Sequence, residues 1–274
     1  MTAEDKFNRL KEGLKKMQRV IIAFSGGVDS TFLLKAASES GLQDVLAVTG
    51  VSESLPEDEL TFTRAMTSTL NINHREIITD ELRNKRYTDN PPDRCYYCKK
   101  ELFEKLIDIA VKENYSYILD GSNVDDDCDW RPGRRAAMEE GVHSPLHDAG
   151  LTKDEIRTLS HMLGLPTWDK PATPCLSSRF PYGHKITPEA LGKVYQAEQY
   201  IRQFGMKELR VRNHSDVARI EIHPKAFPVI MGDEVRERIV GHLKSLGFTY
   251  VTLDLQGFRS GSGNEAINKT NNKE

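Results

Sequence analysis

The sequence predicts an α/β fold with a doubly wound parallel sheet, followed by a second, smaller α+β domain. Three observations favour this class. Short apolar runs alternate with helical patterns between residues 20 and 122, which is typical of a parallel sheet covered by helices. A glycine-rich turn joins the first apolar run directly to a helical pattern. Near residue 184 the pattern changes to a strand pair between helices, which indicates a separate unit.

Apolar periodicity gives the elements of the first domain in order. Apolar residues at helical spacing between 7 and 17 predict an opening amphipathic helix. The string Thr152-Lys153-Asp154-Glu155 has the form of a capping box, which predicts a helix that ends near Gly164. The intervening runs predict strands at 20–24, 45–48, 76–78 and 117–119, and helices at 31–37, 56–70 and 102–110.

The second domain is expected to follow an irregular segment that several prolines pin in place. Thr187-Pro188 predicts a helix start, with proline at the first helical position. Beyond Gly257 the residues are mainly Gly, Ser, Asn and Lys, so we expect a disordered tail. The expected elements are strands at 209–212, 217–222 and 250–255 and helices at 187–204 and 233–246. The expected domains are 1–183 and 184–257, with the tail at 258–274.

The composition excludes several function classes. The 274 residues carry a formal net charge of −3, which argues against a broad nucleic-acid surface but not against a local basic pocket. No apolar run approaches the roughly 20 residues that span a bilayer, and the N-terminus has no signal-peptide core. Four cysteines, two of them in a C-x-x-C pair, suggest metal or redox chemistry. We expect a cytoplasmic protein without nucleic-acid or membrane partners.

The turn Ser25-Gly26-Gly27-Val28-Asp29-Ser30 predicts an anion site. Its two glycines let the backbone turn sharply and approach a ligand, and the N–H groups of the next helical turn face a phosphate. Ser25 and Ser30 add hydroxyl donors, whereas the carboxylate of Asp29 suits a magnesium ion that bridges phosphates. The string is not the lysine-containing G-x-x-x-x-G-K-[ST] loop. An ordinary strand-to-helix turn is the alternative.

Ligands of doubly wound sheets bind beyond the carboxyl ends of the strands. Those ends are expected at Ser25, Gly50 and Gly121, so we expect one crevice there to hold a nucleotide. A polar string follows the third of these ends, with Asp at 125–127 and Arg131-Pro132-Gly133-Arg134-Arg135 after it. This string either contacts phosphate or substrate or forms a solvated loop.

Three of the four cysteines lie where reactive or metal-binding groups are expected. Cys95 and Cys98 are separated by two residues at a predicted helix start, a spacing at which two thiolates share one metal or cluster. Cys175 lies in the proline-rich segment beside Ser178, and heavily constrained loops often carry function. Cys128 lies among aspartates, whose charge disfavours a reactive thiolate. The alternative is that the cysteines are buried small hydrophobic residues.

Arg210 and Arg212 share one face of a predicted strand, because side chains alternate along a strand. If the register agrees, Glu221 of the partner strand and His214 complete a polar floor around them. Two arginines that project together bind a phosphate monoester in a forked geometry. A solvated outer face of the sheet is the alternative.

These strings resemble two nested families. The turn at 25–30 resembles the pyrophosphate loop (PP-loop) of ATP pyrophosphatases, which cleave ATP between the α and β phosphates. The whole chain before the tail resembles the LarE family of PP-loop sulfur transferases. The wider resemblance rests on the strings at 120–123, 131–133, 168–171 and 174–179 and on the arginine strand. Pro174-Cys175-Leu176-Ser177-Ser178-Arg179 is the discriminating string.

The resemblance implies an AMP- and pyrophosphate-forming sulfur transferase that uses ATP and Mg²⁺. ATP adenylates a carboxylate of pyridinium-3,5-dicarboxylic acid mononucleotide, and a sulfur nucleophile then displaces AMP, in biosynthesis of the nickel-pincer cofactor. The implied partners are this mononucleotide, other proteins of that biosynthesis and further copies of the chain. Together, the resemblance and the residue patterns assign catalysis to Asp29 and Cys175. They assign nucleotide binding to Ser25, Gly26, Gly27, Asp29, Ser30, Gly50 and Gly121, and substrate binding to Ser178, Arg179, Arg210 and Arg212.

The family has two branches that differ in the source of sulfur. In one branch the cysteine that matches Cys175 gives up its own sulfur and becomes dehydroalanine. In the other, three cysteines hold a 4Fe–4S cluster whose open iron carries a labile sulfide. Because this chain has Cys95 and Cys98 as well as Cys175, the resemblance favours the second branch, with these three thiolates as ligands.

Three other functions are consistent with a PP-loop. A tRNA-thiolating enzyme also uses three cysteines and a cluster, but the acidic balance of the chain disfavours it. A ligase that uses ammonia, such as NAD synthetase, would not need the cysteines. A nucleotide-sensing module without catalysis is disfavoured by the intact Asp29.

Overall fold

The chain folds into two compact units, seen in a computed structural model that describes residues 1–127, 132–259 and 261–264. The first unit combines Met1–Glu81 with Asp93–Thr173, and the second combines Leu82–Pro92 with Pro174–Glu274. The boundary expected at 183 therefore falls inside the second unit. The side-chain amide of Asn90 donates to the carbonyl oxygens of Phe180 and Pro181 at 3.3 and 2.7 Å, which holds the two segments of that unit together.

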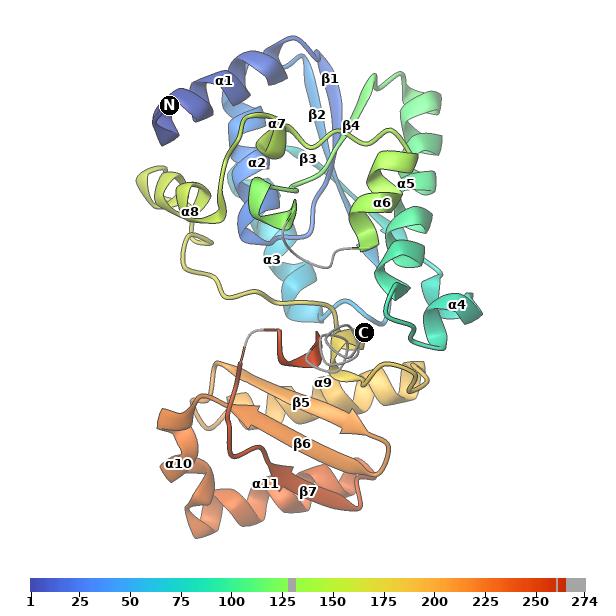
Figure 1. Cartoon of the computed structure of the whole chain (residues 1–274), viewed down its shortest axis with the longest axis vertical. Coiled ribbons are helices and arrows are strands. Elements are labelled where there is room, and N and C mark those ends of the chain that lie inside the picture. Colours follow the sequence, from blue (N-terminus) through green and yellow to red (C-terminus); the bar gives the residue numbers. More distant parts are fainter. Residues whose placement is uncertain (128–131, 260, 265–274) are drawn as a thin grey trace, which may run out of the picture. The chain divides into compact units, whose positions relative to one another are not determined.

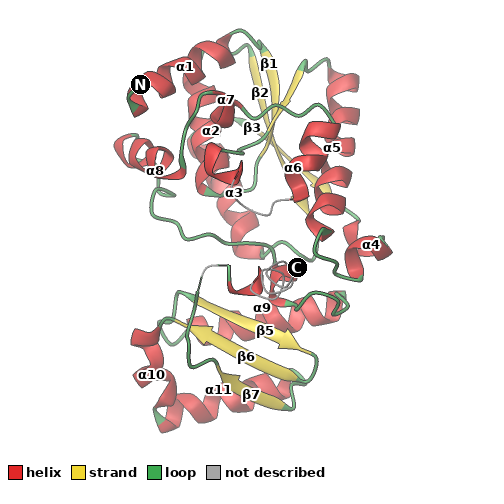
Figure 2. Cartoon of the chain, in the orientation of Figure 1, coloured by secondary structure: helices red, strands yellow, loops and turns green. Residues whose placement is uncertain are grey.

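The first unit is built on a four-stranded sheet in the order β3-β2-β1-β4. All three strand pairs are parallel, as Figure 2 shows with the strands in yellow. The doubly wound parallel sheet is therefore confirmed. The strands are β1 (Arg19–Ala23), β2 (Asp44–Val51), β3 (Asn73–Ile78) and β4 (Tyr117–Leu119).

Helices cover both faces of this sheet (Figure 1). Buried residues of α1, α2, α7 and α8, with Met66 of α3, form one apolar cluster with β1. Buried residues of α5 and α6 form a second cluster on the other face. The helices are α1 (Ala3–Lys15), α2 (Val28–Glu39), α3 (Glu57–Thr69), α5 (Arg94–Glu113), α6 (Pro132–Glu139), α7 (Pro145–Asp148) and α8 (Lys153–Met162), with the short turns η1 (Glu81–Arg83) and η2 (Val124–Asp127).

The second unit is built on a three-stranded sheet in the order β5-β6-β7. The β5–β6 pair is an antiparallel hairpin and β7 runs parallel to β6. The chain reverses at Ser215, whose φ is +64°. The elements are α4 (Lys85–Thr88), η3 (Leu176–Arg179), α9 (Pro188–Arg202), β5 (Leu209–His214), β6 (Val217–Ile222), η4 (Pro224–Ala226), α10 (Phe227–Met231), α11 (Asp233–Ser245), β7 (Tyr250–Leu253) and η5 (Ser262–Asn264).

Alternation along β5 and β6 separates an apolar face from a charged one. Leu209 and Val211 are fully buried in the apolar cluster of the second unit, as the sequence pattern predicts. The opposite face carries Arg210 and Arg212, and the register pairs Arg210 with Glu221 and Arg212 with Arg219. The second unit therefore has a polar face that packing, rather than solvent, covers.

A buried ion pair fixes the segment that contains Cys175. The guanidinium of Arg179 donates from Nε and Nη2 to both oxygens of Glu198 at 2.9 and 3.0 Å. The Arg179 side chain is 1% exposed and that of Glu198 is 4% exposed. The remaining nitrogen, Nη1, donates to the carbonyl oxygens of Pro174 and Cys175 at 2.7 and 3.1 Å. One arginine thus ties η3 and the residues before it to α9.

A second buried carboxylate holds the charged face of the hairpin together. Glu221 is fully buried and accepts from Arg212 at 2.9 Å and from Arg219 at 2.7 Å. Arg212 also donates to Ser262 Oγ at 2.7 Å, so the described part of the expected tail packs on this face. The remaining tail residues, 260 and 265–274, lie outside the described residues.

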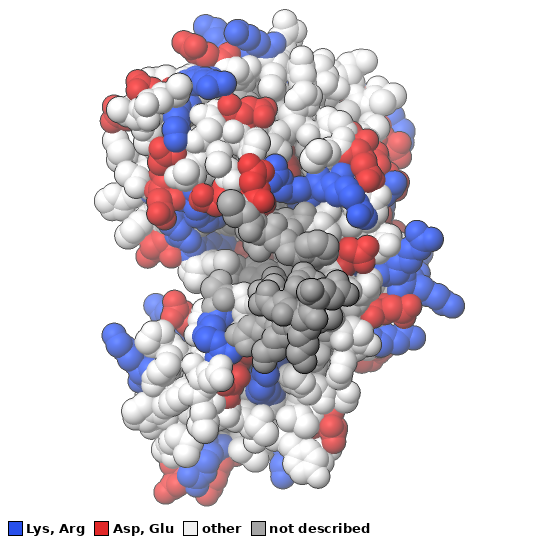
Figure 3. All heavy atoms as spheres, viewed as in Figure 1, with Lys and Arg blue, Asp and Glu red and all other residues white. Residues whose placement is uncertain are grey.

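Charges on the surface are mixed. Figure 3 shows acidic and basic side chains interspersed over the visible face of the first unit, which agrees with the formal charge of −3. Among the residues that the structure describes, no helix is long and apolar enough to cross a membrane.

Substituting Glu198 by alanine is expected to lower the free energy of unfolding by about 3–5 kcal/mol, because a buried guanidinium loses its counter-charge. Equilibrium urea unfolding measures the change. The matched control is Glu234→Ala, which removes an 85% exposed partner of Arg238 on α11 and should change stability by less than about 1 kcal/mol. Similar small losses in both variants would show that Arg179 does not depend on Glu198.

Candidate functional site

The turn between β1 and α2 has the geometry of an anion-binding loop. Gly26 adopts a φ of +71°, which favours glycine. Gly27 caps α2 without a side chain, and its carbonyl accepts from Thr31 at 3.0 Å. The hydroxyls of Ser25 and Ser30 lie 3.1 Å apart at the mouth of the turn. The backbone and hydroxyl donors expected from the sequence therefore converge at the N-terminus of a 12-residue helix.

Gly121 fits against this loop because it has no side chain. A Cβ on Gly121 would lie 2.9 Å from the backbone nitrogen of Ser30 and 3.2 Å from the carbonyl carbon of Asp29. The segment after β4 therefore lies directly against the first turn of α2. Gly50 lies within β2, where a Cβ would meet side chains of Thr79 and Leu102 at 3.1 and 3.2 Å. Both glycines lie at or near strand ends, as predicted.

Asp29 combines one paired and one unpaired oxygen. Its Oδ2 accepts from Nζ of Lys153 at 2.6 Å. Its Oδ1 is buried and has no hydrogen-bond partner among the residues that the structure describes. Buried oxygens without partners are rare in native structures. This carboxylate therefore has coordination capacity for a cation beside the loop.

Lys153 is a site residue that the sequence patterns did not single out. It is the first residue of α8, whose capping box between Thr152 and Glu155 is formed as predicted. Its backbone N–H donates to Asp125 at 2.6 Å, so the segment after β4 also positions it. The capping box marks where α8 begins, but not that the next side chain reaches a carboxylate 124 residues away.

Lys170 is a second such residue. Its ammonium donates to the carbonyl oxygen of Gly26 at 3.1 Å and to Glu59 of α3 at 2.7 Å. It also lies 4.1 Å from the ring centre of Phe62. These contacts link the string at 168–171 to the glycine-rich loop. They are a structural reason for the two strings to occur in the same sequence.

A buried carboxylate lies after the carboxyl end of β3. Glu81 is 2% exposed and accepts from Ser52 and Ser54, the residues beyond β2, at 2.5 and 2.9 Å. Its Oε2 is buried without a hydrogen-bond partner in the described part of the chain. The carboxylate of Glu81 therefore anchors the segment after Gly50 through these two hydroxyls.

The polar string after β4 is partly described. Asp127 contacts Arg134 and accepts a hydrogen bond from Nε2 of His147 at 2.9 Å. These two neighbours, with the arginine the larger influence, lower the pKa of Asp127 below its ordinary value. Arg131 and Cys128 lie outside the described residues.

The cysteines are distributed over both units. Cys95 and Cys98 lie three residues apart in the first turns of α5, and Cys175 precedes η3 in the second unit. None of the three forms a disulfide in the described part of the chain; Cys95 is exposed and the other two are partly buried. No group of three His, Cys, Asp or Glu side chains within the described ranges is placed to hold a metal ion.

The arginine cluster of the second unit carries an excess of positive charge. Arg210 and Arg212 are 6% and 8% exposed, so this face of the hairpin is not solvated. Burial, and next the positive charge of Arg179, lower the pKa of Arg210 to about 10. Arg212 donates to the carbonyl oxygen of Ser178 at 2.7 Å, and Ser178 Oγ accepts from Arg179 at 3.0 Å. The four predicted substrate-binding residues therefore belong to one cluster.

His214 lies at the end of the same strand. Burial, and then nearby positive charge from Arg219, lower its pKa below the ordinary value. Its Nε2 is buried without a hydrogen-bond partner among the described residues. The ring therefore adds a nitrogen without a described partner to the charged face of the hairpin.

The chain is similar to curated proteins over almost its whole length, although no family model matches it. An uncharacterized protein of Synechocystis is 44% identical over 266 residues, which covers 97% of this chain and 99% of the relative. The pyridinium-3,5-bisthiocarboxylic acid mononucleotide synthase of Lactiplantibacillus plantarum is 41% identical over 263 residues, which covers 95% and 94%. An uncharacterized protein of Methanocaldococcus jannaschii is 32% identical over 253 residues, 92% of this chain and 95% of the relative.

The similarity extends through both units, from the glycine-rich loop to the arginine strand. Because this identity covers nearly the full length of both proteins, the similarity is not limited to a shared nucleotide-binding domain. The chain therefore belongs to the LarE family, that of the pyridinium-3,5-bisthiocarboxylic acid mononucleotide synthase.

Proposed function

We propose that this LarE-family chain is an ATP-dependent sulfur transferase that acts on pyridinium-3,5-dicarboxylic acid mononucleotide. The observation that carries the proposal is the turn at 25–30, with its glycine conformation, its converging donors and the half-paired carboxylate of Asp29. The Lactiplantibacillus relative is named for the synthesis of pyridinium-3,5-bisthiocarboxylic acid mononucleotide, and this product supplies the substrate class. ATP is the nucleotide.

The first half-reaction activates a poor electrophile. A carboxylate oxygen of the substrate attacks the α-phosphorus of ATP, the bond between the α and β phosphates breaks, and pyrophosphate leaves. The donors at the N-terminus of α2 hold phosphate oxygens, and Lys153 neutralises charge on the departing pyrophosphate. Asp29 fits Mg²⁺, because its Oδ1 is buried without a partner in the described chain and a carboxylate is a preferred ligand. The ion would neutralise phosphate charge there.

The second half-reaction replaces oxygen by sulfur. A sulfur nucleophile attacks the acyl carbon of the adenylate, and the bond to AMP breaks. The arginine cluster suits the phosphate of the mononucleotide, because it holds four guanidinium groups (Arg179, Arg210, Arg212 and Arg219) against three carboxylates (Glu198, Glu221 and Asp254). A phosphate monoester would balance this excess with forked hydrogen bonds.

For the sulfur donor we propose a 4Fe–4S cluster held by Cys95, Cys98 and Cys175. The chemistry of this donor set suits such a cluster, since three thiolates would leave one iron open and none of the three cysteines is in a disulfide in the described chain. Such a cluster supplies a labile sulfide from its open iron. The alternative is that Cys175 gives up its own sulfur.

Asp29→Ala is expected to abolish pyrophosphate release while the protein stays folded. Lys153→Met is expected to slow it by about 10- to 100-fold, since one charge-assisted hydrogen bond to phosphate contributes about 1.5–3 kcal/mol. Pyrophosphate release with ATP and substrate measures both effects, and circular dichroism checks folding. The control is Lys35→Met, which removes the partner of Glu39 at the far end of α2. Full activity in Asp29→Ala would remove the PP-loop assignment.

Arg212→Ala is expected to raise the apparent KM for the mononucleotide by about 10- to 100-fold, from loss of one charge-assisted phosphate contact, with little change in the KM for ATP. Steady-state kinetics separate the two substrates. Arg238→Ala, on the exposed face of α11, is the matched control. An unchanged KM for the mononucleotide would mean that Arg212 serves only to pair Glu221.

Serine substitutions of Cys95, Cys98 and Cys175 test the sulfur donor. Each is expected to abolish iron binding and sulfur transfer yet leave AMP formation largely intact, because adenylation needs no thiol. Iron content, visible absorbance and product mass are measured on anaerobically purified protein, with Cys128→Ser as the control. Iron-free protein that is fully active, needs only Cys175 and loses the mass of hydrogen sulfide after turnover would contradict the cluster.

A further inference from the structure

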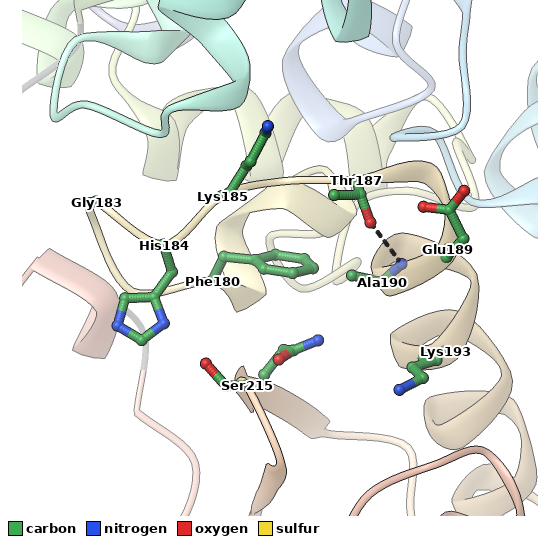
Figure 4. Close-up of a pocket in the computed structure, with 10 residues that line it drawn as sticks. Phe180, Gly183, His184, Lys185, Thr187, Glu189, Ala190, Lys193 and Ser215 are labelled. Atoms are coloured by element: carbon green, nitrogen blue, oxygen red, sulfur yellow. Dashed lines mark hydrogen bonds between the residues drawn. The ribbon is translucent and has the colours of Figure 1, made fainter.

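A cavity of about 500 Å³ lies within the second unit, at the N-terminal end of α9. Figure 4 shows the ring of Phe180 on one side of it, Lys193 and Ser215 on the other, and His184 at one end. Its volume is typical of sites for small molecules, which occupy roughly 300–1,000 Å³. The lining residues are Phe180, Gly183, His184, Lys185, Thr187, Glu189, Ala190, Lys193, Asn213 and Ser215.

Asn213 lines this cavity with a carboxamide that has no hydrogen-bond partner among the described residues. The residue is 6% exposed and lines the cavity, and its side chain makes no hydrogen bond within the part of the chain that the structure describes. A carboxamide offers two N–H donors and an acceptor, and buried polar side chains are normally hydrogen-bonded. This unused capacity, directed into a cavity, indicates a ligand.

The position of Asn213 separates this cavity from the arginine cluster. Side chains alternate along a strand, so Asn213 shares the face of β5 that carries Val211, whereas Arg210 and Arg212 lie on the other face. The two sites therefore lie on opposite faces of one strand. A ligand in the cavity would not occupy the proposed position of the mononucleotide phosphate.

The charge around the cavity favours an anion. Lys193 faces it, whereas Figure 4 shows the carboxylate of Glu189 and the ammonium of Lys185 directed away from Phe180. The ammonium of Lys193 donates to the carbonyl oxygen of Gly247 at 3.3 Å and lies 5.4 Å from the ring centre of Phe248, which leaves it N–H donors to spare. The N-terminus of the 15-residue α9 lies at the same end, where Thr187 caps the N–H of Ala190 at 3.2 Å.

We propose that this cavity binds a small phosphate ester of nucleotide size, at a site additional to those of the proposed reaction. The ammonium of Lys193, the hydroxyl of Ser215, the carboxamide of Asn213 and the positive end of α9 supply donors of the kind that phosphate oxygens accept. The ring of Phe180 and the cavity volume of about 500 Å³ provide for an organic part. An inorganic anion alone would leave this apolar wall unused.

Such a ligand would contact elements that hold the segment of Cys175. Phe180 directly follows Arg179, and Lys193 lies on α9, the helix that carries Glu198. The cavity is therefore placed as an effector site next to the sulfur-transfer segment, and not as a second copy of the substrate site.

Titration calorimetry on the full-length protein tests the proposal, with ribose 5-phosphate, AMP and inorganic phosphate as probes. The variants are Lys193→Met and Asn213→Asp, which place a neutral or a negative group in the cavity at nearly unchanged size. Lys225→Met is the control, since Lys225 is exposed on η4 and does not line the cavity. Circular dichroism confirms that each variant folds.

Ribose 5-phosphate or AMP is expected to bind the wild-type protein at a site that both cavity variants weaken by at least about tenfold, as loss of one charge-assisted contact implies. The control should bind as the wild type does. The proposal is overturned if neither ester binds, or if Lys193→Met leaves binding of both unchanged. Inorganic phosphate that binds as tightly as the esters would also overturn it, because the organic part would then contribute nothing.

Discussion

The buried ion pair between Arg179 and Glu198 is the constraint on which the second unit depends. A guanidinium that is 1% exposed must have a counter-charge within reach, because an unpaired charge in the interior costs several kcal/mol. Glu198 of α9 supplies this counter-charge and also accepts a hydrogen bond from the backbone N–H of Val211 at 3.0 Å. Helix, strand and the Cys175 segment therefore meet at one carboxylate, and the proline-rich string needs no regular secondary structure to be fixed.

In the first unit, the constraint is that several hydrogen-bond donors of the loop at 25–30 must be held close together while the space in front of them stays open. Gly121 contributes by having no Cβ, so that the segment after β4 lies against the first turn of α2. Lys170 contributes by donating a hydrogen bond from its ammonium to the carbonyl oxygen of Gly26. The loop is thus preorganised by its neighbours, which would reduce the free-energy cost of ordering it around the proposed nucleotide.

Local patterns predicted most of the fold, because periodicity reports which face of an element is buried. They placed the strands of the parallel sheet, the capping box at Thr152 and the shared face of Arg210 and Arg212. They missed what depends on contacts distant in sequence. The segment 82–92 joins the second unit through Asn90, whose side chain bonds carbonyls some 90 residues away. Neither the local composition nor the apolar periodicity of the sequence indicates a hydrogen bond between residues so far apart.

The pairing of Asp29 with Lys153 shows why the missed contacts bear on function. A carboxylate beside a phosphate-binding loop repels the ligand unless a cation offsets it. Lys153 supplies that cation at 2.6 Å, and its backbone is fixed by the start of α8 and by Asp125. In the proposed reaction a flexible four-carbon stem lets the ammonium follow phosphate charge, while the second oxygen of Asp29 stays available to a metal ion. One residue pair thus offsets the charge of the carboxylate and leaves its second oxygen for the proposed metal ion.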